Sequence, residues 1–256
     1  MATARPLAII DELLATVDYL RISVGEAARD PDRWMPCAPL VTDEAALAAL
    51  VATTTSERGT DRDDVATSLF VQGYAFRIAT AAIGAWLLSG STLDVAPDDV
   101  AIAMGRGRPN AVDLAVAATS PAGAPIADVH AHLIDGHLAP LVDNAHRSCR
   151  VGAALLWGNV AASCASAFGA VAGALPARRV EIRDRAEEFF ATARPEVRDG
   201  GRLVRVGQQF AWERRSCCLW YKTESAWLCE DCSLRPASDH EARYAAMRRD
   251  VMDAGT

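Results

Sequence analysis

The chain has 256 residues, of which 51% are hydrophobic, so it can bury a substantial core within one large domain. Its net charge is −7, and its positive charges are scattered arginines and one lysine, Lys222. Because no basic face is evident, the sequence excludes nucleic acid as a partner and favours proteins or small molecules.

The first ten residues lack the basic stretch, apolar stretch and cleavage site of a signal peptide. The seven cysteines are an odd number, and four of them lie close together. This pattern favours reduced thiols over a disulfide framework. We therefore expect a cytoplasmic protein.

Apolar residues at steps of three and four predict helices over 5–28, 42–53 and 63–88. Thr42 is the expected N-terminal cap of the second helix. The third is either one long helix or two abutting helices. Cys37, which lies in the proline-rich segment 30–41 between the first two helices, is expected to be a small buried hydrophobe.

Two short apolar runs around a Gly/Pro/Asn turn predict a small β-hairpin near 95–118. Gly105 and Gly107 in this turn do not form a dinucleotide-binding fingerprint, because Asn110 stands where the third glycine belongs.

The next stretch, 128–150, is predicted to be helical and contains His130, His132, His137 and His146. Their spacing does not match a metal-hydrolase pattern, so they are interpreted as ordinary helix histidines. The stretch 151–175 carries no charge and is long enough to span a bilayer. Its small residues and its flanking arginines on both sides favour a buried helix pair instead. Within it, Gly158 permits a close approach and Asn159 needs a polar partner.

An amphipathic helix over 178–192 and a last helix over 239–252, capped by Ser238, complete the prediction. The expected fold is mainly α, a single helical domain with the small hairpin and a C-terminal cysteine-rich segment. We divide the chain into a helical body, 1–200, and a C-terminal segment with a closing helix, 201–256.

Four clustered cysteines are the most informative feature, and they are Cys217, Cys218, Cys229 and Cys232. Four thiolates suit a metal centre. Adjacent cysteines in extended backbone point to opposite faces, which is awkward for one zinc ion but acceptable for a cluster with two irons. An iron-sulfur cluster is favoured, while a zinc site and thiol redox chemistry stay open.

Aromatic and basic residues surround these cysteines. The candidates for substrate docking or cluster tuning are Arg214, Arg215, Trp220, Tyr221, Lys222 and Trp227. The stretch 202–235 has six basic and four acidic residues, and the excess positive charge would raise the reduction potential of a cluster. Ordinary solvated charges and aromatic packing are the alternative interpretation.

The motif Arg214-Arg215-x-Cys217-Cys218-x10-Cys229-x2-Cys232 resembles the C-terminal signature of the FhuF-like ferric-siderophore reductases, including Asp231. The Leu-Trp-Gly-Asn at 156–159 is also similar to a helical element of that family. The resemblance implies that the four cysteines hold a 2Fe-2S cluster. The chain departs from the family in Glu230, after the third cysteine, and in the loop 223–226.

The resemblance also implies a ferric-siderophore reductase that passes one electron to chelated Fe(III) and releases Fe(II). Hard hydroxamate oxygens hold Fe(III) far better than Fe(II), so one electron weakens the complex. No catalytic side chain beyond the cluster is needed.

The partners implied are a ferric hydroxamate-type siderophore, bound on a face of the helical body, and a separate electron donor such as a ferredoxin or a flavin reductase. No integral membrane span is expected, and peripheral association with a membrane stays open. Two other functions stay open as well, a zinc-stabilised non-enzymatic binding module and an iron-sulfur redox sensor.

Overall fold

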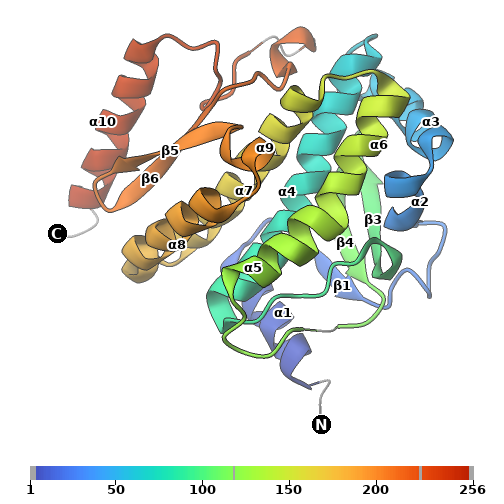
Figure 1. The fold of residues 1–256 in the computed structure, drawn as a ribbon, viewed down its shortest axis with the longest axis horizontal. Coiled ribbons are helices and arrows are strands. Elements are labelled where there is room, and N and C mark those ends of the chain that lie inside the picture. Colours follow the sequence, from blue (N-terminus) through green and yellow to red (C-terminus); the bar gives the residue numbers. More distant parts are fainter. Residues whose placement is uncertain (1–3, 118, 225–226, 254–256) are drawn as a thin grey trace.

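Two long central helices form the core of the protein (Figure 1). The computed structural model describes residues 4–117, 119–224 and 227–253. Helices α4 (Asp63–Ser89) and α7 (Ala153–Ala174) pack along each other and are apolar on almost every side. Because nearly all their faces are covered, the other elements are arranged around this pair.

A four-stranded sheet packs against α4, chiefly through β4. The strand order is β1-β4-β3-β2, in which β1 runs parallel to β4 and the other pairs are antiparallel. A separate two-stranded hairpin packs against α7. The strands are β1 (Ile22–Val24), β2 (Trp34–Pro36), β3 (Val100–Gly105), β4 (Arg108–Leu114), β5 (Gly201–Val206) and β6 (Gln209–Arg214).

Shorter helices cover the rest of the core, and α10 lies beside the β5–β6 hairpin at the C-terminal end (Figure 1). These helices are α1 (Ala4–Thr16), α2 (Cys37–Thr42), α3 (Glu44–Thr55), α5 (Ile126–Val129), α6 (Ala139–Cys149), α8 (Arg179–Thr192), α9 (Pro195–Arg198) and α10 (Ala237–Asp253). A π-helical segment, His130–Leu138, joins α5 to α6.

The predicted mainly α fold and the hairpin near 95–118, which is β3–β4, are confirmed. The region 63–88 is one helix, α4. Cys37 is fully buried, as expected. The hairpin belongs to a larger sheet because β1 and β2, from the distant N-terminal region, add to its two edges.

Several predicted boundaries were wrong. The first helix ends at Thr16 rather than at 28, because residues 22–24 pair with β4 as a strand. Asp43, not Thr42, caps α3, since its carboxylate accepts from the main-chain N–H groups of Ala45 and Ala46. The last helix begins at Ala237, so Ser238 lies inside it.

The uncharged stretch 151–175 is one helix, α7, rather than a helix pair. Among the described residues it is the one helix long and apolar enough to cross a membrane, but most of it is buried by neighbouring elements. This burial is consistent with the core helix of a soluble protein. The β5–β6 hairpin, which no sequence pattern predicted, covers part of it.

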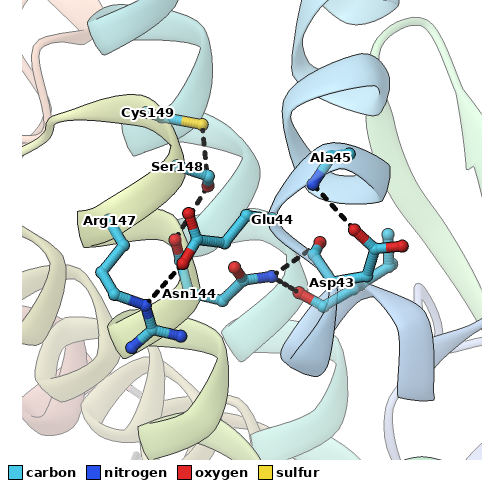
Figure 2. A network of polar contacts seen from close by, with 8 residues as sticks. Asp43, Glu44, Ala45, Asn144, Arg147, Ser148 and Cys149 are labelled. Carbon is cyan, nitrogen blue, oxygen red and sulfur yellow. Dashed lines mark hydrogen bonds and ion pairs between the residues drawn. The ribbon is translucent and has the colours of Figure 1, made fainter.

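Figure 2 shows how the buried side chain of Asn144 on α6 joins the α2–α3 corner to the core. Its Nδ2 donates to the carbonyl oxygens of Leu40, at 2.8 Å, and Asp43, at 3.1 Å. On the surface nearby, Arg147 pairs with Glu44 at 2.8 Å, with both side chains 54% exposed. The buried contact should therefore matter more than the exposed one.

We expect Asn144→Ala to lower the free energy of unfolding by about 1–3 kcal/mol, because the buried carbonyl of Leu40 and the part-buried carbonyl of Asp43 lose the Asn144 donor. Arg147→Ala, its matched control on the same helix, should cost less than about 1 kcal/mol because the exposed ion pair is screened by solvent. Urea unfolding of both variants measures the difference. Equal losses would contradict this account.

His137 is a fully buried histidine within the π-helical segment. Its Nδ1–H donates to the carbonyl of Val95, and its Nε2 accepts from the hydroxyl of Tyr74 at 2.6 Å. Burial lowers the pKa of His137 to about 4. The imidazole is therefore neutral in the folded protein at neutral pH.

Below pH 6.5 the unfolded chain takes up a proton at this position that the folded chain does not, so stability should fall between pH 6.5 and pH 4. The contribution is at most about 3 kcal/mol. Unfolding experiments across this range should show a shallower pH dependence for His137→Gln than for the wild type. His132→Gln, which alters an exposed histidine of the same segment, should keep the wild-type dependence.

Candidate metal centre

The four clustered cysteines lie between the end of β6 and the start of α10, and their sulfur atoms form two close pairs. Cys217 Sγ lies 3.8 Å from Cys232 Sγ, and Cys218 Sγ lies 3.4 Å from Cys229 Sγ. Two thiolates on one tetrahedral metal with bonds of about 2.3 Å are about 3.8 Å apart. The Cys217–Cys232 pair has this spacing, and the Cys218–Cys229 pair, at 3.4 Å, is slightly closer.

A local turn follows the two adjacent cysteines. Leu219, the residue after them, has a left-handed backbone with φ of 67°, which non-glycine residues seldom adopt. Its N–H donates to Cys217 Sγ at 3.3 Å, and the short helix Trp220–Lys222 follows. The two neighbouring side chains enter different sulfur pairs, so the dipeptide supplies one sulfur to each pair.

A chain of buried polar groups attaches this turn to the central helices. Arg214 Nη2 donates to Asn159 Oδ1 on α7. Asn159 Nδ2 donates to both the carbonyl and the hydroxyl oxygen of Ser68 on α4, each at 2.9 Å. The Ser68 hydroxyl donates to the carbonyl oxygen of Cys218 at 2.8 Å. Asn159 therefore has the partners that its burial requires.

Several buried polar atoms around the cysteines have no hydrogen-bond partner among the described residues. They are Arg214 Nε, Arg214 Nη1, Ser216 Oγ and Trp220 Nε1. Buried donors are almost always paired in native proteins, so this group indicates an acceptor that protein atoms do not supply. A sulfur-rich cluster provides such acceptors, and the residues present fit one.

The electrostatics of the second sulfur pair favour a thiolate at Cys218. The thiol of Cys229 donates to it, which lowers the pKa of Cys218 to about 6 and raises that of Cys229. The positive charge of Arg214 also lowers the pKa of Cys218. At Cys217, burial raises the pKa to about 11. Metal binding requires deprotonated thiols. Of these three cysteines, Cys218 loses its proton most readily.

The aromatic candidates gather on the outside of the same segment. The rings of Trp220 and Trp227 meet edge to face, with centroids 6.5 Å apart. Trp227 is 64% exposed and Tyr221 is also exposed, with Lys222 Nζ 5.8 Å from the tyrosine ring. Trp220 is half-buried and packs with Cys218 and Cys229, so this surface lies next to one sulfur pair.

The two adjacent arginines have different environments. Arg214 is buried, and its side chain donates a hydrogen bond to Asn159 Oδ1. Arg215 is exposed, and its Nη1 donates to the carbonyl oxygen of Asp199 at 3.3 Å. Arg214 is therefore not available for surface docking.

Sequence reasoning missed two residues that contact this region. Arg58 stacks over the ring of Trp220, with its Cζ 5.5 Å from the ring centroid. The hydroxyl of Ser68 donates a hydrogen bond to the carbonyl oxygen of Cys218. Both lie about 150 residues before the cysteines, and nothing in their local pattern separates them from ordinary helix residues.

Gly158 is the position where α7 touches the cysteine turn. A Cβ at this position would overlap Ser216 Oγ, and the residue after Ser216 is the first cysteine. The glycine allows the close approach that its sequence context suggested.

We expect Gly158→Ala to push the turn away from α7 and to reduce bound iron per chain, measured on protein purified without oxygen. Gly169→Ala on the same helix is the matched control, because no atom lies within 4 Å of the added methyl group. This control should retain iron and gain up to about 1 kcal/mol in stability, because alanine favours helix. Full iron retention in Gly158→Ala would show that the contact does not position the turn.

Two family comparisons match the chain. The family described as "Ferric iron reductase FhuF-like transporter" matches residues 68–199, just over half of the 256 residues. The "FhuF 2Fe-2S C-terminal domain" matches residues 214–234, which include all four clustered cysteines.

None of the curated proteins compared with the chain matches it. The second family assigns a 2Fe-2S cluster as the cofactor, in agreement with the paired sulfurs and the unpartnered donors around them. The chain therefore belongs to the FhuF-like ferric iron reductase family, as the resemblance of its cysteine motif predicted.

Proposed function

We propose that this protein is a ferric-siderophore reductase that transfers one electron to Fe(III) held by a hydroxamate-type siderophore and thereby releases Fe(II). The observation that carries the proposal is the arrangement of the four sulfurs in two metal-spaced pairs beside an exposed aromatic surface. Family membership supports the redox class of the reaction.

The proposed ligands of the cluster are Cys217, Cys218, Cys229 and Cys232. We assign the pair Cys217 and Cys232 to one iron and the pair Cys218 and Cys229 to the other, on the basis of their separations of 3.8 and 3.4 Å. Under this assignment, each iron joins one residue of the adjacent pair to one residue of the Cys-x-x-Cys. The cluster, when bound, supplies a one-electron carrier.

The rest of the chain has two tasks, which are to shield the sulfurs and to admit a chelate. Cys218 and Cys232 are buried, whereas Cys217 and Cys229 are half-buried, so the centre has a protected side and an accessible side. Electron transfer requires approach to the accessible side but no nucleophile or general base. Since Fe(II) is a softer ion, the hydroxamate oxygens hold it less tightly after reduction.

We propose that the chelate docks on the surface formed by the exposed Tyr221 and Trp227 and the half-buried Trp220 and Lys222. Arg215 would contribute charge at the margin. Of these residues, Lys222 lines an open cavity of about 590 Å³, together with the carboxylates of Asp61 and Glu224. The aromatic rings provide apolar contact area for the organic part of a siderophore. Lys222 supplies positive charge near its oxygen atoms.

The electron is proposed to come from a separate protein, a ferredoxin or a flavin reductase, in the cytoplasm. In this proposal, the helical body, 1–200, supports the cluster segment, 201–256, and contributes part of the docking face. Trp212 of β6 packs against Phe190 of α8, with ring centroids 4.4 Å apart. This contact would hold the cluster segment against the helical body.

The test uses protein purified without oxygen. The wild type should contain iron and acid-labile sulfide and show visible absorption that bleaches on reduction and returns when a ferric hydroxamate is added. Serine at any of the four proposed ligand positions should abolish this absorption. Cys149→Ser, which changes a half-buried cysteine on α6, should leave it intact.

Two results would refute the proposal. A colourless protein with stoichiometric zinc would contradict the ligand assignment. A cluster that can be reduced but is not reoxidised by the ferric chelate would leave the cofactor in place and contradict the reductase function.

A further inference from the structure

Arg214 is a buried positive charge. Its side chain is 4% exposed, and within the described residues it forms no ion pair. Among the residues that the structure describes, its one side-chain partner is the neutral amide oxygen of Asn159, and Nε and Nη1 have none. A guanidinium removed from water in this way is strongly unfavourable unless a negative group compensates for it.

Hydrogen bonds connect Arg214 to both arms of the cysteine segment. Its main-chain N–H donates to the carbonyl oxygen of Asp231, within the Cys-x-x-Cys, at 3.3 Å. Its side chain reaches the carbonyl of Cys218 through Asn159 and Ser68. Arg214 therefore contacts one arm of the cysteine segment directly and the other through two buried groups.

We propose that Arg214 is the internal counter-charge of the 2Fe-2S cluster, and that its free Nε–H and Nη1–H groups donate to sulfur and raise the reduction potential. The proposal rests on the ligand assignment made under the proposed function. Four thiolates make the centre negative, and reduction adds one more negative charge. A nearby positive charge therefore stabilises the reduced form more than the oxidised form.

Arg215 supplies a matched control. It is the next residue and carries the same charge, but its side chain is 64% exposed and lies near Asp199. Solvent screens an exposed charge, so this arginine should have little influence on the potential. A comparison of the two separates the effect of a buried counter-charge from that of net charge.

The experiment is a spectroelectrochemical titration of the cluster-loaded protein with redox mediators and no siderophore. At the wild-type midpoint potential, Arg214→Gln should lower the ratio of reduced to oxidised protein by about tenfold, equivalent to about 59 mV for one electron. Arg214→Lys, which keeps the charge but loses the forked donors, should fall between Gln and the wild type. Arg215→Gln should leave the ratio unchanged.

Asn159→Asp provides a second test, in which the oxygen that accepts from Arg214 is kept and the two donations from Nδ2 to Ser68 are lost. The new carboxylate would pair with the guanidinium and neutralise its field, so the midpoint potential should again fall. This variant and Arg214→Lys decide the matter if Arg214→Gln does not load a cluster. Wild-type potentials in both would overturn the proposal, as would equal shifts in Arg214→Gln and Arg215→Gln.

The titration also distinguishes this proposal from the reductase function. A protein whose potential shifts as expected, but whose reduced form does not react with a ferric hydroxamate, would refute the function and retain the counter-charge. A protein that binds no iron would refute the ligand assignment and with it both proposals.

Discussion

The side-chain amide of Asn159 is the contact on which the cysteine segment depends. It donates to Ser68 on α4 and accepts from Arg214 at the end of β6, while its own main chain belongs to α7. Three elements that are distant in sequence therefore meet at one buried side chain. Since a buried polar group left unpaired costs about 1–3 kcal/mol, a shift of any one element would be opposed at this point.

This attachment explains how a redox centre can be both shielded and accessible. The central helices hold the inner side of the cysteine turn through Ser68 and Gly158, where main chain and small side chains come into close contact. The outer side carries exposed aromatic rings and the half-buried Cys229. A centre that accepts an electron from one partner and gives it to another needs this asymmetry.

Much of the fold could be predicted because helix periodicity is a local property. The prediction was wrong where a distant partner decides the structure: Val17 and Leu20 continue the apolar steps of α1, but the chain then joins β4 as a strand, about 90 residues away. The β5–β6 hairpin was missed since its residues alternate weakly, with arginine at positions 202 and 205. Its stability comes from packing on α7 and α8, which no local pattern reveals.

The spacing of the cysteines was enough to predict a metal centre, but it could not predict which other residues surround them. Arg214 and Arg215 look equivalent in the sequence, and only the structure shows that one is buried and the other exposed. Gly158 and Asn159 were recognisable as residues that need a close neighbour, yet the neighbours, Ser216 and Arg214, lie more than 50 residues away.

The pairing of the sulfurs has a consequence for how this segment can change. Each pair joins Cys217 or Cys218 to a cysteine ten or more residues later, so the loop between them is closed at both ends. Doubling the length of a flexible closed loop costs only about 0.6 kcal/mol. A longer loop between the two sulfur pairs would therefore cost little free energy, and the paired cysteines at its ends could keep their positions.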